Sequence, residues 1–345
     1  MLVFTIFSCT IIVTHPLLPL LSGDLVKKIF GHFFVFIPLI IRHLLISNTE
    51  LKMENKTVGH RFTVLDSWRG ICACMVALFH FHVNNHFYDI PVFMNAGLFV
   101  DFFFVLSGFV IFINYQDKLK ENFGLGRFMM LRFGRLYPLH FATFLAFVSV
   151  ELIQIIIPSL SNLADTAPFA GPGSTPKYII HNILLIHSFG VGEKLSFNGP
   201  SWSISAEFYT YLIYGIILVA FKKRSTLGVI AIMALSLLFL IVYGNFMTTA
   251  NFGIFRCLYG FGAGALCAIL WVKYNEKVPF GNTAKKIWNS IELLTVTIVI
   301  LFVSFAKNTD FVFIRSPLNS FFIIELQPGI SVQITGVPQE QSSNI

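Results

Sequence analysis

The chain has 345 residues, of which 55% are hydrophobic and only 12% are charged, and 40 of them are phenylalanine. A soluble domain of this length needs far less apolar surface, so the composition excludes an ordinary globular enzyme and predicts a membrane protein. The formal net charge is +7, but the basic residues gather in a few loops, which favours membrane topology over nucleic-acid binding. The five cysteines lie in apolar stretches and indicate neither a disulfide framework nor a metal site.

About eight to ten apolar segments follow one another along the chain, and several are long enough to cross a hydrocarbon core of about 30 Å as helices. They cover 1–21, 29–46, 65–83, 96–115, 136–157, 178–191, 202–221, 226–243, 252–272 and 291–306. Because these runs are continuous rather than alternating, we expect an all-α, multi-pass transmembrane helical bundle in the lipid bilayer rather than a barrel.

The basic residues between the runs predict the topology. They fall into three clusters, Lys118, Lys120, Arg127, Arg132 and Arg135; Lys222, Lys223 and Arg224; and Lys273, Lys277, Lys285 and Lys286. All three clusters can face the cytoplasm if 178–191, which is short, is re-entrant or interfacial. The alternative is that 178–191 spans the membrane and one cluster faces outward.

The two ends of the chain differ from the rest. The first run lacks a basic n-region and a small-residue cleavage site, so it is a poor signal peptide. Met53 opens a polar leader that runs directly into LDSWRG, and we expect 1–52 to be an upstream extension. Residues 53–315 form the expected integral-membrane domain, and 316–345 read as a non-spanning tail.

Arg69 and His80 stand eleven residues apart in an otherwise apolar stretch. Eleven residues at 3.6 per turn return almost to the same helix face, about 16 Å further along the axis. Such groups are costly to keep in lipid, and the usual reason to keep them is chemistry or transport.

Four further patterns carry polar residues in or beside the apolar runs. They are GLFVDFFFVLSGF with Asp101 and Ser107, RFGRLYP with Arg132 and Arg135, NGPSWSISAEF with Trp202, Ser203 and Glu207, and FRCLYGFGAG with Arg256. At four of these points the chain resembles the membrane-bound acyltransferase family 3, in pattern and in order, across roughly 65–265. The four are LDSWRG with its His80, FFFVLSGF, RFGRLYP and NGPSWSISAEF.

The resemblance implies an O-acyltransferase that moves an acyl group, most simply acetyl, from acyl-CoA to a hydroxyl of an envelope polysaccharide or glycolipid, in a bacterial inner membrane. It implies that His80 is catalytic, either as a base toward the acceptor hydroxyl or as the acyl carrier. Arg69 at the helix mouth either reaches toward the membrane surface as a topology residue or binds an anionic group. Arg132 and Arg135 are either ordinary positive-inside charges or a clamp for the phosphates of coenzyme A. Acyl-CoA is a co-substrate, and we expect neither a permanently bound cofactor nor a metal.

Several of these residues have two interpretations each. Glu207 lies about 7 Å into its span and serves either as a second acid or base, or as the ion-pair partner of Arg69 or Arg256. Asp101 either contacts substrate or pairs with a buried arginine. Trp202 is an interfacial aromatic or a substrate contact, and the hydroxyl of Ser203 bonds substrate or its own helix.

Small residues predict close helix contacts. The Ser107–Gly108 pair permits close helix approach, and Gly260 to Gly264 fit a small-xxx-small contact better than a nucleotide loop, because no strand precedes them.

Two other classes of function stay open at this stage. A multi-pass transporter also keeps intramembrane Arg, His and Glu, as a proton or substrate relay. A purely structural membrane component is the third class. The family's usual C-terminal GxxSYxxYLxH-like pattern is not found after residue 309, so we expect the chain to be truncated.

Overall fold

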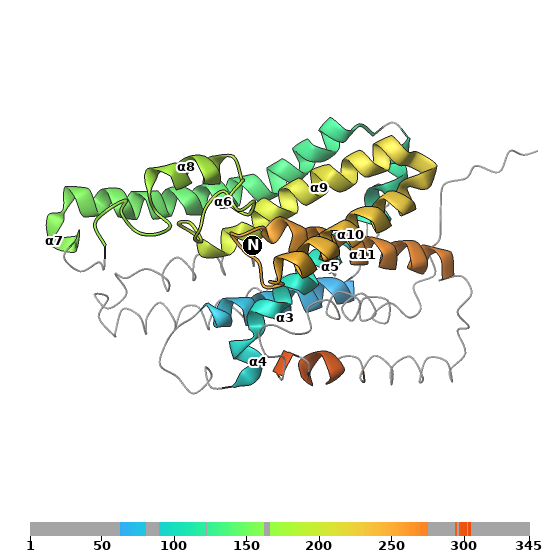
Figure 1. Ribbon diagram of the computed structural model, residues 1–345, viewed down its shortest axis with the longest axis horizontal. Coiled ribbons are helices and arrows are strands. Elements are labelled where there is room, and N and C mark those ends of the chain that lie inside the picture. The colour runs from blue at the N-terminus through green and yellow to red at the C-terminus, as the bar shows by residue number, and fades with distance from the viewer. Residues whose placement is uncertain are drawn as a thin grey trace, which may run out of the picture.

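The computed structural model describes residues 63–80, 90–121, 123–161 and 166–274, together with 294, 297–301, 303 and 304. Every regular element in these ranges is a helix, as expected (Figure 1). Among the described residues, four helical stretches are long and apolar enough to cross a membrane, Ala96–Lys120, Leu125–Ile156, Gly199–Tyr243 and Gly253–Lys273. The expected runs 1–21 and 29–46 and the tail 316–345 lie outside the described residues.

Three parallel helices form the core, α5 (Phe99–Lys120), α9 (Trp202–Phe221) and α11 (Gly253–Tyr274). Aromatic pairs fix the direction of α9 along α5, because Phe104 contacts Trp202 and Phe112 contacts Tyr214. For α11, an ion pair joins the starts of α5 and α11, and Phe109 contacts Trp271 further along. The three helices therefore begin at one end of the molecule and finish at the other.

Two helices run the opposite way, α6 (Leu125–Ile156) and α10 (Ser225–Tyr243). The start of α6 lies against the far part of α9, where a Cβ on Gly215 would be 2.6 Å from Leu125. The 3-10 helix η6 (Lys222–Arg224) reverses the chain from α9 into α10, and Figure 1 shows these helices side by side. Consequently the ends of α5, α9 and α11 and the starts of α6 and α10 lie together at one end of the molecule. This end, here named the basic end, holds most of the basic residues in the described part of the chain.

Two glycines let α5 and α11 approach at backbone distance. A Cβ on Gly108 would lie 2.0 Å from the carbonyl oxygen of Phe261, and one on Gly264 would lie 1.8 Å from that of Val105. No side chain fits in such a gap, so both positions require glycine. The predicted small-residue contact is confirmed at Gly264, and the predicted close approach at Gly108.

The helix α3 (Thr63–Phe79) packs along α5 and stops before the predicted end of its apolar run at 83. Residues 81–89 lie outside the described residues. The short helices α4 (Pro91–Met94) and η4 (Ala96–Leu98) lead into α5, and Asn95 between them donates a 2.9 Å hydrogen bond to the carbonyl of Val303.

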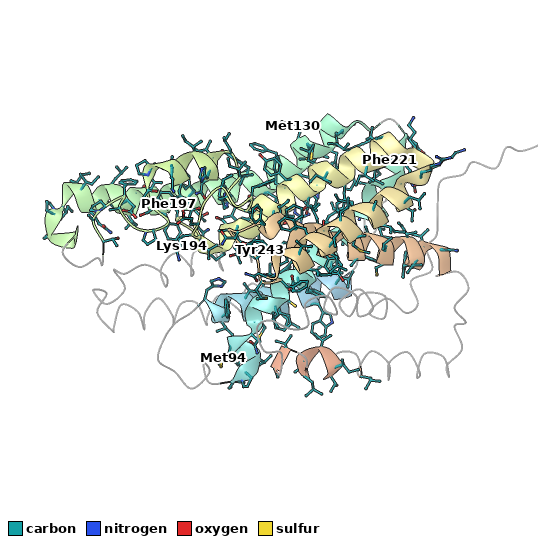
Figure 2. The ribbon with its side chains drawn as sticks, in the orientation of Figure 1. Met94, Met130, Lys194, Phe197, Phe221 and Tyr243 are labelled. Carbon is teal, nitrogen blue, oxygen red and sulfur yellow. The ribbon has the colours of Figure 1, made fainter. Side chains whose placement is uncertain are left out.

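The predicted run 178–191 does not form a spanning helix. It contains α8 (Pro176–Ile183), whose eight residues extend only about 12 Å, followed by a turn-rich segment leading to η5 (Gly199–Ser201). This segment, with α7 (Pro158–Ser161), lies at the end opposite the basic end (Figure 1). Large apolar side chains on the outside of α6 and α10 stay exposed, as expected of helices that face lipid. They include Ile156 at 76% and Val242 at 79%, together with Met130 of α6 and Tyr243 of α10 (Figure 2).

Candidate active site

Asp101 and Arg256 form a buried ion pair where α5 and α11 begin. Arg256 Nε donates to Asp101 Oδ1 at 2.7 Å and its NH2 group donates to Oδ2 at 3.0 Å, while both side chains are about 3% exposed. This two-bond geometry matches the planar fork of the guanidinium to the carboxylate. Asp101 is therefore the partner of a buried arginine, one of its two predicted roles, and Glu207 is not the mate of Arg256.

Trp202 covers this ion pair from the start of α9. Its ring centroid lies 5.4 Å from the Arg256 guanidinium and 5.8 Å from the ring of Phe104, and the side chain is only 7% exposed. The indole is thus inside the bundle rather than at its rim. Ser203, one residue later, donates to the carbonyl of Pro200 at 3.0 Å, which leaves its hydroxyl engaged with the start of its own helix.

Glu207 lies deeper in the bundle, at the centre of a small hydrogen-bonded group. Its Oε1 atom accepts a 2.5 Å hydrogen bond from the hydroxyl of Ser107 on α5 and a second one from the hydroxyl of Tyr211, one turn further along α9. No basic residue in the described part of the chain forms an ion pair with this carboxylate. Two hydroxyl donors therefore hold Glu207 in place and leave its charge uncompensated.

Arg132 lies between this group and the basic end. The side chain is 8% exposed, and its guanidinium sits over the rings of Tyr115 (4.9 Å), Phe128 (5.7 Å) and Tyr211 (5.9 Å). Its NH2 group donates to the Tyr115 hydroxyl at 2.9 Å, but its buried Nε has no hydrogen-bond partner. No carboxylate among the described residues pairs with it, so Arg132 is a buried cation with spare donor capacity, suited to an anionic ligand.

Arg135 and Arg127 flank Arg132 on α6, and both side chains are exposed. Arg127 rests on the ring of Phe123 at 4.9 Å. Arg135 is close enough for its charge to act on the hydroxyl of Tyr211. Of the predicted pair on α6, Arg132 is therefore a buried cation and Arg135 an exposed one.

His80 lies one residue beyond the end of α3, and its Nδ1 donates to the carbonyl of Val76 at 2.8 Å. Its neighbour Phe79 packs against η4, 3.3 Å from where a Cβ on Gly97 would stand. This contact places His80 near the start of α5, at the end that holds Asp101. Arg69 is half-buried on α3, ten residues before Phe79.

A second polar group lies beside α9 and was missed by the sequence analysis. His140 of α6 stacks on His187 with ring centroids 5.5 Å apart, and Nε2 of His187 is 3.1 Å from the hydroxyl of Ser201. Burial lowers the pKa of His187 to about 4, helped by the neighbouring His140 and opposed by hydrogen bonds to Ser201 and His181. The signal was available, since both histidines interrupt apolar stretches as His80 does.

Tyr115 and Tyr211 were also missed. Tyr211 follows Glu207 at i+4, a spacing that brings side chains together on one helix face, so it was detectable. Tyr115 carries no such local signal, because its partner Arg132 lies on the next helix.

A sequence model described as an acyltransferase domain matches residues 62–337. The chain belongs to the acyltransferase 3 family. It is accordingly a membrane protein and an acyltransferase that transfers a group other than an aminoacyl group. The match extends past 315, into the segment predicted to be a tail.

Three curated proteins are similar to this acyltransferase. Protein 2 in the picA locus of Rhizobium radiobacter is 29% identical over 183 residues, 52% of this chain and 93% of its own length. The acyltransferase MdmB of Streptomyces mycarofaciens is 35% identical over 117 residues, 33% of this chain and 26% of its own length. The peptidoglycan O-acetyltransferase OatA of Listeria monocytogenes is 26% identical over 223 residues, 60% of this chain and 35% of its own length. No solved structure matches the chain.

Proposed function

We propose that this protein moves an acyl group, most simply acetyl, from acyl-CoA to a hydroxyl of an envelope polysaccharide or glycolipid. The observation that carries the proposal is the buried Arg132, which has no carboxylate partner among the described residues and an unused Nε donor. A buried charge of this kind is costly unless a counter-charge joins it. The phosphates of coenzyme A supply such a counter-charge.

The basic end is the side from which the donor would arrive. Basic residues collect on the cytoplasmic side of membrane proteins, and acyl-CoA is made in the cytosol. The exposed Arg135 would attract the phosphates first, and Arg132 would bind them as they lose water. Tyr211 links this anion site to the carboxylate of Glu207, because its ring lies under the guanidinium and its hydroxyl donates to Oε1.

Glu207 and His80 are the proposed proton acceptors, with Arg69 as the third member of the catalytic set. The acceptor hydroxyl oxygen bonds to the thioester carbonyl carbon, its proton passes to one of these two bases, and the carbon–sulfur bond breaks. The departing sulfur then takes a proton and leaves as the thiol of coenzyme A. Ser107 keeps Glu207 oriented during this exchange through its 2.5 Å hydrogen bond.

The acceptor would approach from the end opposite the basic end. At that end the ion pair of Asp101 and Arg256 joins α5 to α11, and Trp202 and Ser203 are the first two residues of α9. An envelope glycan as acceptor is supported by one of the relatives, which is a peptidoglycan O-acetyltransferase. We place the protein in a bacterial inner membrane, where a cytosolic donor and an extracytoplasmic glycan meet at opposite faces.

The test compares Arg132→Gln with Arg127→Gln in membrane vesicles supplied with labelled acetyl-CoA and a soluble N-acetylglucosamine oligomer. A hydrogen bond to a charged group is worth about 1.5–3 kcal/mol, so Arg132→Gln should raise the KM for acetyl-CoA by roughly 10- to 100-fold. Arg127, exposed at the same end, is the matched control and should change that KM by less than about threefold. An unchanged KM in a folded Arg132→Gln protein refutes the donor site.

A further inference from the structure

Five buried polar residues form a cluster where α6 and α8 meet the segment that leads into α9. We call this set, His140, Asn182, His187, Asn198 and Ser201, the histidine cluster. Each of its side chains is at most 4% exposed. The proposed acyl transfer uses none of them, although Ser201 directly precedes Trp202 at the start of α9.

The hydrogen bonds of the cluster determine where His140 carries its proton. Nδ1 of His187 lies 3.3 Å from the carbonyl oxygen of His181, and its Nε2 lies 3.1 Å from the hydroxyl of Ser201, which donates at 2.7 Å to the carbonyl oxygen of Asn198. Nε2 of His140 is 3.0 Å from the carbonyl oxygen of Asn182, which can only accept, so this Nε2 is the donor. Nδ1 of His140 is therefore an acceptor.

Three acceptors in the cluster lack donors, namely Nδ1 of His140, Oδ1 of Asn182 and Oδ1 of Asn198. They belong to one connected group. The ring of His140 contacts the Asn182 carbonyl, and Asn198 donates a 3.4 Å hydrogen bond to Thr143, one turn after His140. Buried acceptors are nearly always satisfied in folded proteins, and three in one connected group of residues point to a ligand that donates hydrogen bonds.

We propose that the histidine cluster is an enclosed binding site for hydroxyl groups. The ligand supplies several hydrogen-bond donors, either neighbouring hydroxyl groups of the acceptor sugar or two bound waters, because one hydroxyl donates a single hydrogen bond and one water donates two. Its O–H groups donate to His140, Asn182 and Asn198 beside the Ser201–His187 pair. The sugar alternative rests on the proposed function, because it places the site on the acceptor's side, whereas the water alternative does not depend on it.

The decisive variant is Asn198→Leu, which removes the unsatisfied oxygen and keeps a similar volume. Its amide nitrogen makes only the long contact with Thr143, so little else is lost. The measurement is the thermal midpoint of the detergent-solubilised protein, with and without a soluble N-acetylglucosamine oligomer and in the absence of any acyl donor. Thr175→Val is the matched control, because it removes a buried unpartnered oxygen outside the cluster.

If a sugar hydroxyl occupies the site, the oligomer raises the midpoint of the unsubstituted protein by several degrees and that of Asn198→Leu by less than one degree. If water occupies it, the oligomer has no effect and Asn198→Leu lowers the midpoint by several degrees, while Thr175→Val does not. An Asn198→Leu midpoint equal to or above that of the unsubstituted protein, with the same response to the oligomer, overturns the proposal. Since no readout uses acyl transfer, this test can fail while the proposed function stands.

Discussion

Replacing Asp101 by alanine should destabilise the protein more than any exposed substitution at either end of the bundle. Asp101 accepts hydrogen bonds of 2.7 and 3.0 Å from Arg256, and both side chains are about 3% exposed. Without the carboxylate, Arg256 keeps a 3.4 Å contact with the carbonyl of Thr248 and the ring of Trp202. These contacts are weak compensation for an unpaired buried charge. Removing one partner of a buried ion pair costs about 3–5 kcal/mol.

For a chain of 345 residues, a loss of this size corresponds to a fall of roughly 4–7 °C in the midpoint of thermal unfolding, measured in detergent. The double variant Asp101→Leu with Arg256→Met should regain most of that loss, because it removes both charges and fills the space. Asp117→Ala is the control, since Asp117 is exposed and its 3.8 Å ion pair with Lys120 contributes at most about 0.5 kcal/mol. An Asp101→Ala midpoint within 1 °C of the unsubstituted protein, or a double variant no better than the single one, refutes the reasoning.

Two further predictions concern packing and pH. Gly264→Ala should lower the thermal midpoint by several degrees, because its Cβ would lie 1.8 Å from the Val105 carbonyl oxygen. A Cβ at Gly134 would meet nothing within 4 Å, so Gly134→Ala is the control and should be neutral or stabilising. Equal midpoints for the two variants would contradict the close helix contact. Stability should also fall as the pH drops from about 6.5 to 4, because the unfolded chain protonates His187 at its ordinary pKa of 6.5 while the folded protein does so only at a pKa of about 4. The maximum loss of stability from this pKa shift is about 3 kcal/mol, and the neighbouring His140 and His181 are expected to titrate as well. His187→Gln should flatten the pH dependence of the thermal midpoint. An unaltered pH profile would exclude His187 as its source.

The sequence predicted the features that depend on short stretches of chain. Continuous apolar runs predicted the long helices, and the short length of 178–191 suited a segment that does not cross, although a spanning segment stayed open. Glycine spacing predicted the contact at Gly264, because only small residues let two backbones meet.

Pairings between distant residues could not be predicted in this way. Asp101 and Arg256 are 155 residues apart, and a pattern of charges does not say whether Asp101 or Glu207 reaches the arginine. The donors to Glu207 depend on how α5 and α9 are placed along each other, which side-chain packing decides. The histidine cluster needs the segment after α8 to fold back onto α6, and no local signal predicts that return. The roles of Arg69 and His80 stay predictions.

The central claim is that a carboxylate held by two hydroxyl donors takes part in acyl transfer from acyl-CoA. The most direct measurement is the rate at which membranes release the thiol of coenzyme A from acetyl-CoA in the presence of an N-acetylglucosamine oligomer, compared for the unsubstituted protein and Glu207→Gln at equal amounts of folded protein. Loss of a positioned acid or base predicts a fall of about 10²- to 10⁴-fold, with the KM for acetyl-CoA little changed. Thiol release by Glu207→Gln at the unsubstituted rate would contradict the account.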